Sequence, residues 1–443
     1  MLAITLAVFL THRGVIGDRV APRDAMAMAA WLAQHPADWH TATDLTEAAL
    51  DSPAARRFEL WRAAYGLARS TAPRSQNPMI GFVRGGLFHW YELNAADRAA
   101  VLAAAAPLMR DPPIFVELLR PLWELTHDMG WLRRTAPDTI NAFTELRTIA
   151  AANGLFGEYR EIRAAIRRQR LETFRTSASS LAAHDLPQLL PSPIEQEYEP
   201  LVRAILAELK RRSFEPERFG ETMTSVIEYA LRHQLPLEGL TPFIEAQQGL
   251  PAHTRARLAL ALGNRDAATN IEMTSAASSP DWQAYHLERA ELEARRGDVA
   301  AANRHLSLVM VVRTDAEVLD RALRVSTILH DDATAAQLRR QLRALSNAPR
   351  EWLGTCGHNE LCGSAHMLTW TNGKPVTITA TAVQSDQIAP YLEIYADDAR
   401  VAEAEIADER RFTIALPAGV HRMEVRLVNP KITNGAQRRV RLS

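Results

Sequence analysis

The chain has 443 residues, of which 47% are hydrophobic and 23% are charged. This length predicts two or three domains, and the composition excludes a disordered or fibrous chain. The 51 basic and 52 acidic residues nearly cancel. No net charge therefore draws the whole protein to nucleic acid, and we expect no nucleic-acid partner.

An uninterrupted apolar run opens the sequence at residues 1–10 and leads into Thr11, His12 and Arg13. A membrane-spanning helix needs ~20 such residues. The run also lacks a preceding Lys or Arg and a small-x-small cleavage site after it. We interpret residues 1–20 as an anchor, a signal remnant or the tail of a membrane region, with an apolar first helix as the alternative. The prediction is a membrane-tethered protein on the periplasmic or extracellular side.

Helical periodicity dominates from about residue 23 to 347. Apolar residues return every three or four positions, which predicts helices at 24–34, 54–69, 95–109, 114–125, 139–152, 156–174, 194–212, 218–232 and 240–247. A stretch rich in Ser, Ala and Pro at 176–192 is the predicted seam between a helical domain at 21–180 and a repeat domain at 181–348. Paired helices joined by short turns suggest an α-solenoid.

A 34-residue period appears in the second half of this helical region. The predicted equivalent turns are Gly263-Asn264, Gly297-Asp298 and Asp331-Asp332, each followed by an alanine (Ala268, Ala302, Ala336) and preceded by Ala256, Ala290 and Arg324. This pattern resembles the tetratricopeptide repeat over residues 250–346, although the aromatic positions of that family are poorly filled. The resemblance implies that the repeats bind a protein partner on a concave face.

After Pro349 the period changes to two, which is typical of strands. Strands are predicted at 366–370, 376–381, 391–395, 401–406, 411–416, 421–428 and 438–442. They describe a small antiparallel β-sandwich over residues 349–443. The predicted fold class is therefore mostly α with a C-terminal all-β domain, an α-solenoid followed by the sandwich.

The order of three sequence segments in this domain points to a particular family more specifically than the alternation of polar and apolar residues does. Residues 390–398, the hairpin 412–421 and the strand 424–429 together resemble the calcium-dependent xylan-binding type of carbohydrate-binding module. In that family calcium is held by two acidic residues. One follows the asparagine that ends the last of these strands, and the other precedes an arginine after a glycine-rich loop. Pro430 and Gln437 occupy the matching positions here, so the acidic ligands that a hard cation prefers are missing. We expect no cofactor, and calcium-dependent binding is placed in doubt.

Aromatic side chains offer another way to hold a sugar ring. Tyr391, Glu393 and Tyr395 are two residues apart and share one face of a strand. The candidate carbohydrate-binding residues are Trp370, Tyr391, Glu393, Tyr395, Asn429 and Arg438. The alternative is that the aromatic residues are ordinary half-buried sheet residues.

Both cysteines of the chain, Cys356 and Cys362, lie in one short loop. Such a close pair favours a disulfide in an oxidising compartment. Free thiols, or a metal site that includes His358 and His366, are the alternatives.

Two further clusters have structural and functional interpretations. Phe82, Phe88, Trp90 and Tyr91 around His89 are interpreted as a hydrophobic plug between helices, with a ligand-binding loop as the alternative. A basic stripe is interpreted as a solvated helix face, with a site for phosphates or acidic polymers as the alternative; it comprises Arg160, Arg163, Arg167, Arg168 and Arg170.

The common catalytic motifs are missing from the sequence, which lowers the odds of an enzyme without excluding one. We therefore expect no catalytic residues. The functional hypothesis is a non-enzymatic scaffold or recognition protein in polysaccharide assembly or handling at the cell envelope. A glycan-processing enzyme with its active site in the helical part, or a purely structural assembly subunit, are the alternatives.

Overall fold

The computed structural model of the chain describes residues 25–51, 57–275, 280–312, 316–345, 351–353, 359–362, 366–371, 375–383, 387–417, 420–430, 432–433 and 436–443. The apolar segment 1–20 and Cys356 lie outside these residues. The chain divides into two compact units, Met1–Leu146 and Arg147–Ser443. Within the described part, no helix is both long and apolar enough to cross a membrane.

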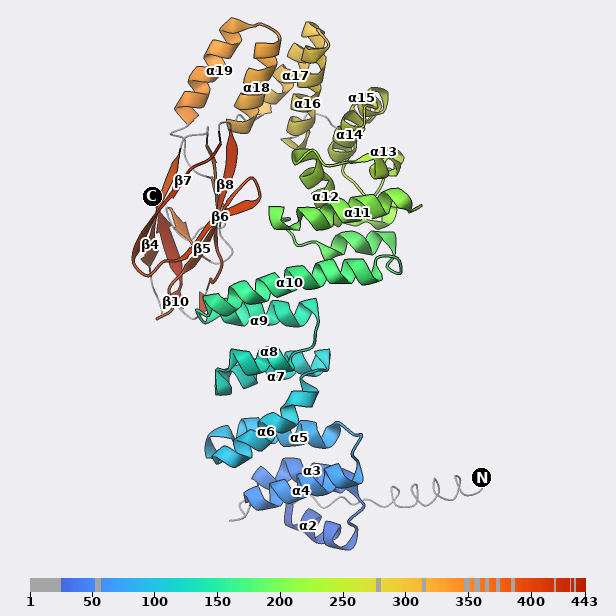
Figure 1. Cartoon of the computed structure of the whole chain (residues 1–443), viewed down its shortest axis with the longest axis vertical. Helices are drawn as coiled ribbons and strands as arrows, with labels where there is room; N and C mark the ends of the chain where they lie inside the picture. Colours follow the sequence, from blue (N-terminus) through green and yellow to red (C-terminus); the bar gives the residue numbers. More distant parts are fainter. Residues whose placement is uncertain are drawn as a thin grey trace. The chain divides into compact units, whose positions relative to one another are not determined.

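The first unit is helical (Figure 1). Its helices are α2 (Ala25–Gln34), α3 (Trp39–Asp51), α4 (Arg57–Thr71), α5 (Asn77–Phe88), η1 (Trp90–Glu92), α6 (Ala95–Leu108), α7 (Pro112–Thr126) and α8 (Met129–Thr135), and α9 (Ile140–Ala152) crosses the division. Trp61, which is buried, and Tyr65, which is partly buried, belong to α4, and each stacks on Phe82 of α5 with ring centroids 4.0 Å apart. Glycine also permits a close approach of α5 to α6, because a Cβ on Gly86 would lie 2.3 Å from Val101.

The predicted hydrophobic plug in this unit is half right. Phe82 and Trp90 are buried, whereas Phe88 and Tyr91 are 82% and 81% exposed. The helix α5 ends at Phe88, and the two exposed rings, Phe88 and Tyr91, lie on either side of buried Trp90 in the sequence.

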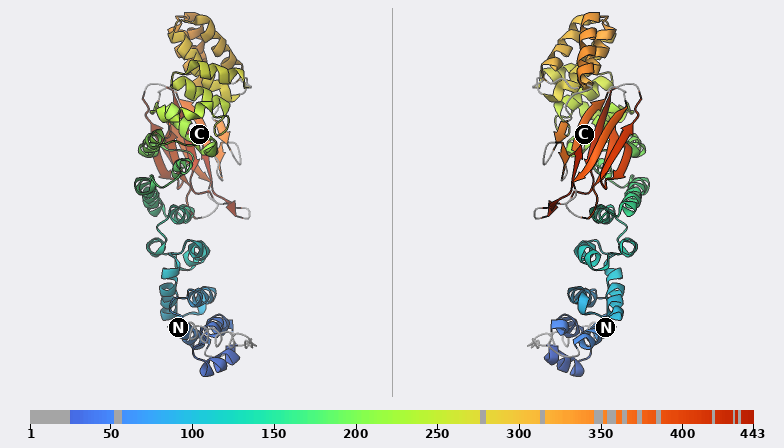
Figure 2. Two further views of the ribbon diagram at one scale, coloured as in Figure 1. Left: turned by 90° about the vertical axis from the view of Figure 1, so that its right-hand side faces the viewer. Right: turned by 90° about the vertical axis from the view of Figure 1, so that its left-hand side faces the viewer.

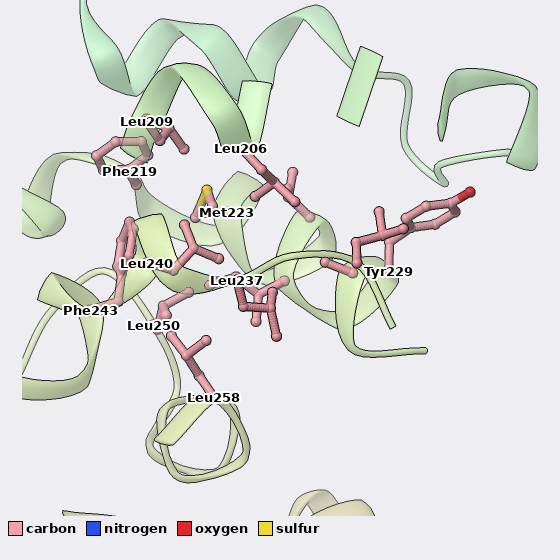
Figure 3. Close-up of a cluster of buried hydrophobic side chains, with 14 of the residues drawn as sticks. Leu206, Leu209, Phe219, Met223, Tyr229, Leu237, Leu240, Phe243, Leu250 and Leu258 are labelled. Atoms are coloured by element: carbon pink, nitrogen blue, oxygen red, sulfur yellow. The ribbon is translucent and has the colours of Figure 1, made fainter. Parts of the chain in front are cut away.

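The second unit continues with antiparallel helices. They are α10 (Phe156–Ser177), η2 (Ala183–Leu189), η3 (Gln196–Tyr198), α11 (Glu199–Arg211), η4 (Pro216–Arg218), α12 (Gly220–Arg232), η5 (Glu238–Leu240), α13 (Pro242–Glu245), α14 (Ala252–Ala261), α15 (Arg265–Met273), η6 (Pro280–Trp282), α16 (Gln283–Arg295), α17 (Val299–Val312), α18 (Ala316–Ile328) and α19 (Asp332–Leu345). Figure 3 shows one apolar core that α11, α12, α13 and α14 share, with Leu206, Met223, Phe243 and Leu258 pointing inward. The predicted seam lies inside this unit, since Leu186 and Leu190 belong to the same core.

Three helical hairpins, α14–α15, α16–α17 and α18–α19, follow the predicted repeat. Gly263 and Gly297 adopt positive φ angles of 79° and 82°, and Asn264 and Asp298 cap the helices that follow. A glycine suits this left-handed position because it has no Cβ to clash.

The third turn lies one residue earlier than predicted. His330 has the positive φ angle of 55°, and Asp331 accepts the capping hydrogen bond from the backbone N–H of Thr334. The buried alanine after this turn is consequently Ala335, at 1% exposure, and not Ala336. Arg324, predicted at a small-residue position, is exposed, and buried Ala322 lies nearby.

The C-terminal domain is a sandwich of antiparallel sheets, as predicted. Its strands are β1 (Glu351–Leu353), β2 (Glu360–Leu361), β3 (His366–Thr371), β4 (Val376–Val383), β5 (Tyr391–Ala396), β6 (Ala399–Glu405), β7 (Glu409–Ile414), β8 (His421–Leu427), β9 (Ile432–Thr433), β10 (Ala436–Gln437) and β11 (Arg439–Leu442). One sheet has the order β1-β3-β8-β5-β6 and the other β2-β11-β4-β7, with β9 and β10 as a separate pair. Figure 2 shows the strands side by side. A core that includes Ile378, Ile394, Val425 and Val440 joins the two larger sheets.

The observed fold class is thus mostly α with a C-terminal β domain, as the sequence patterns indicate. Helices α3, α5 and α8 and the short strands β1, β2, β9 and β10 were not predicted. The β5–β6 connection is a two-residue turn in which Asp397 and Asp398 have φ angles of 48° and 72°. Aspartate tolerates this conformation better than most residues, and the resulting turn matches the twist of a hairpin.

Candidate functional site

A groove of about 960 Å³ lies along one side of the helices of the second unit. Helices α12, α14, α16 and α18 supply its walls, and each contributes residues spaced three or four apart. On α16 these are Ala284, Glu288, Glu291 and Arg295, a spacing that places them on one helix face. The charged groove is defined by its charged lining residues: Glu228, Asp281, Glu288, Glu291, Glu317, Arg232, Arg257, Arg295, Arg321 and Arg324.

The floor of the charged groove is organised around Glu288. Two nitrogens of Arg257 donate hydrogen bonds to its Oε1, at 3.1 and 3.0 Å, and a nitrogen of Arg321 lies 3.9 Å from the same oxygen. Burial disfavours the charged form of Arg257, but the attraction of Glu288 outweighs it and raises the pKa of Arg257. The floor therefore carries two fixed positive groups around one negative group.

The rim of the charged groove is more exposed. The side chains of Arg295 and Arg324 are 66% and 56% exposed, and each pairs with a carboxylate one turn away on its own helix. Burial lowers the pKa of His253 at the wall, so its imidazole is neutral at neutral pH. With five carboxylates and five guanidinium groups, the lining suits a polypeptide of mixed charge better than a strongly acidic or basic polymer.

A second candidate site is the contact between the sandwich and helix α10, both in the second unit (Figure 1). Tyr391 stacks on Phe156 with ring centroids 4.3 Å apart. The carboxylate of Glu393 accepts hydrogen bonds from Arg163 and Tyr159, at 2.6 and 3.1 Å. We call this contact of Phe156, Tyr159 and Arg163 with Tyr391, Glu393 and Tyr395 the sandwich seat.

The sandwich seat changes the interpretation of the candidate sugar-binding residues. Tyr391, Glu393 and Tyr395 share one strand face, as predicted, but their exposed fractions are only 3%, 4% and 1%. The helical array covers that face, so it is not open to a sugar ring in this structure. Of the predicted alternatives, buried sheet residues describe the two tyrosines better. Arg163 likewise departs from the predicted solvated stripe, since its side chain is 9% exposed.

A second carboxylate, that of Glu195, joins the sandwich seat from the segment before η3. Its Oε1 accepts a hydrogen bond from Tyr395 at 2.9 Å and lies 3.3 Å from a nitrogen of Arg426. Arg426 also stacks over the Tyr395 ring at 4.1 Å. Burial, together with repulsion from Glu393, raises the pKa of Glu195 to about 7. Burial and the two carboxylates also raise the pKa of Tyr395, which stays protonated as a donor.

Asp398, in the β5–β6 turn, makes a second link between the sandwich and the helices. Its carboxylate pairs with Arg232 and with His233 of the helical array, and with Arg422 of β8 at 3.0 Å. Burial alone would raise the pKa of Asp398, but the hydrogen bond from His233 and the attraction of the two arginines lower it to about 2. The backbone carbonyl of Asp398 also accepts a hydrogen bond from the N–H of Gln196.

The other candidate sugar-binding residues have structural partners too. Asn429 accepts a hydrogen bond from the N–H of Tyr391 and donates one to the carbonyl of Ala389. Arg438, fully buried, donates to the carbonyls of Asn429 and Ala152, at 2.6 and 3.3 Å. Both residues therefore fix the end of β8 and tie it to α9.

The remaining predicted residues fall partly outside the described part of the chain. The side chains of Trp370 and Gln437 are not described, and neither is any part of Cys356. Cys362 is buried, at 7% exposure. The Cys356–Cys362 disulfide therefore remains a prediction, and so does the expected absence of a cofactor, with calcium binding in doubt.

The residues of the charged groove were missed in the sequence interpretation. A signal for them exists: the charged positions 288, 291 and 295 of α16 repeat at helical spacing, opposite the small buried residues that carry the repeat. No protein-family model and no curated protein matches this chain.

Proposed function

We propose that this chain is a non-enzymatic scaffold of the cell envelope that binds a segment of a protein partner in the charged groove. The single observation that carries the proposal is the alignment of α12, α14, α16 and α18, whose charged side chains converge on one groove of about 960 Å³. The tetratricopeptide-like spacing of the hairpins supports it, because arrays of this kind bind polypeptides on such a face.

The sandwich has a structural role in this proposal. Its strand β5 packs on α10, and Asp398 pairs with Arg232, which also lines the charged groove. The sandwich thereby holds the C-terminal end of α12 at the groove wall. The envelope location and the link to polysaccharide assembly or handling follow from the apolar N-terminal segment and from the resemblance of the sandwich to a carbohydrate-binding module.

Site-specific photo-crosslinking in cells that produce the full chain tests the proposal. A benzophenone amino acid replaces Ala284 in the groove or, as a control, Ser307 on the exposed outer face of α17. A protein adduct that forms from position 284 and not from position 307 is expected. Equal adducts from both positions, or none from position 284, would contradict a partner site in the groove.

An enzyme remains the second candidate because of one observation. Glu195 is partly buried, has a pKa raised to about 7, and borders a smaller pocket of about 320 Å³ with Glu197 and Asp398. Such perturbed carboxylates occur in active sites. The hydrogen bonds of Glu195 to Tyr395 and Arg426, however, serve the sandwich seat. Glycan hydrolysis by the purified chain that Glu195→Gln abolishes would favour the enzyme.

A further inference from the structure

A cluster of two histidines and one glutamate lies behind the charged groove, on the opposite side of α16. Glu272 comes from α15, His286 from α16 and His305 from α17, so the cluster joins two consecutive hairpins. His286 is two residues from the groove residues 284 and 288, which turns it about 200° away from them around the helix.

The three side chains present their ligand atoms to one point. The Nδ1 atoms of His286 and His305 are 3.1 Å apart, and Oε1 of Glu272 lies 3.8 and 3.9 Å from them. The centre of a triangle with these sides is about 2.1 Å from each corner. That distance falls within the about 2.0 to 2.2 Å that Zn²⁺ keeps from imidazole nitrogen and carboxylate oxygen.

The surroundings hold the glutamate in this orientation. The hydroxyl of buried Tyr285 donates a hydrogen bond of 2.6 Å to Oε2 of Glu272, which leaves Oε1 turned toward the histidines. Metal ligands are commonly oriented by such outer-shell hydrogen bonds. His286 and His305 are buried, while Glu272 keeps 19% exposure, which gives an ion a route from solvent.

We propose that Glu272, His286 and His305 bind one Zn²⁺ ion that fastens α15, α16 and α17 together. Two imidazoles and a carboxylate are ligands that Zn²⁺ accepts, and a water molecule would serve as the fourth. Since the ligands come together only in the folded array, the ion stabilises the folded state by mass action. The competing interpretation is a pair of imidazoles that share a hydrogen bond with no metal.

Zinc titration of the full chain, stripped with a chelator and followed by calorimetry and thermal unfolding, tests the site. We expect binding of one equivalent and a rise in Tm of several degrees, on the order of 2 to 4 °C for each kcal/mol. Glu272→Gln keeps the shape of the side chain and should weaken binding at least about 100-fold. Tyr285→Phe, which removes the hydrogen bond that orients Glu272, should weaken binding about 10- to 100-fold.

Two further variants separate this site from other zinc ligands of the chain. His184→Gln removes a partly exposed histidine on η2 and should leave affinity unchanged. Cys362→Ser removes a ligand of the alternative cysteine and histidine site near residue 360 and should also leave it unchanged. A Co²⁺ spectrum without a thiolate charge-transfer band is expected.

Failure of the stripped protein to bind Zn²⁺ would overturn the proposal in favour of the metal-free imidazole pair. Binding that persists in Glu272→Gln but disappears in Cys362→Ser would overturn it as well, because the ion would then lie in the cysteine loop. His305→Gln should also abolish binding. If His305→Gln does not fold because His305 is buried, Glu272→Gln still tests the site, since Glu272 is partly exposed.

Discussion

Arg163 of α10 donates a hydrogen bond of 2.6 Å to Glu393 of β5, although the two residues are 230 positions apart in the sequence. Their side chains are 9% and 5% exposed. The pair is therefore a buried ion pair that joins the sandwich to the helical array. Tyr159 adds a second donor to the same oxygen at 3.1 Å.

Arg163→Met should destabilise the protein strongly, because it leaves the carboxylate of Glu393 buried without its closest cation. Loss of one partner of a buried pair costs about 3 to 5 kcal/mol. Urea unfolding of the full chain measures the effect. The double variant Arg163→Met with Glu393→Gln should recover part of the loss, since no buried charge is then stranded.

Arg167→Met is the matched control on the same helix. Arg167 pairs with Glu197 at 2.6 Å, but its side chain is 44% exposed. Exposed pairs contribute about 0 to 1 kcal/mol. Equal losses in the two single variants would show that the sandwich seat does not depend on the buried pair.

The alternation of residues 391–395 correctly predicts that Tyr391, Glu393 and Tyr395 share a face. It does not predict what covers that face, because the covering residues, Phe156 and Arg163, lie far away in the sequence and belong to a helix with an ordinary basic stripe. Polar and aromatic residues on a strand fit a sugar site and a buried docking site equally well. Only the contact with α10 separates the two interpretations.

The turns of the helical repeat were also predicted from the sequence only in part. Glycine at positions 263 and 297 marks two turns, since both residues adopt positive φ. The third turn uses His330, whose side chain carries no such signal, so the constant spacing of 34 residues placed that turn one residue too late. The sequence alone does not distinguish the charged residues of the groove from a solvated helix face, because charges on helices are usually solvated.

Raising the pH from about 4.5 to about 7 should weaken the protein through Glu195. Its pKa is raised from 4.5 to about 7 in the folded state, so the folded protein holds a proton that the unfolded chain has released. The stabilisation is complete below about pH 4.5 and is lost as the pH rises through 7. We expect a loss on the order of 2 kcal/mol in urea unfolding.

Glu195→Gln should remove this pH dependence, because the amide stays neutral and still accepts a hydrogen bond from Tyr395. The difference in unfolding free energy between wild type and variant isolates the residue from all other titrating groups. A difference that stays constant from pH 4.5 to 8 would contradict the raised pKa.

Lowering the pH should weaken the ion pairs of Asp398, whereas raising the pH acts on Glu195. Its pKa is lowered from 3.8 to about 2, so its contribution is present above about pH 4 and disappears as the pH falls through 2. Asp398→Asn should be less stable than wild type at pH 6 by an amount on the order of 2 kcal/mol, and the difference should shrink toward pH 2. Asp408→Asn, at an exposed position of the same domain, should show no such convergence.

Charge reversal at the rim of the charged groove should impair partner binding without unfolding the array. Arg295 and Arg324 are exposed, and among the described residues each forms an ion pair within its own helix, worth about 0.3 to 0.5 kcal/mol. Replacing both with glutamate changes the lining from five guanidinium groups and five carboxylates to three and seven. Adduct formation from position 284 should fall about tenfold, and the effect should diminish in high salt, because rim charges act mainly on association.

The double variant Arg339→Glu with Arg340→Glu provides the same change of net charge on the exposed face of α19. It should leave the adduct yield unchanged, because neither residue lines the groove. If both double variants lose the adduct equally, the partner responds to the total charge of the protein. If neither loses it, the partner binds elsewhere on the helices, and the charged groove is not its site.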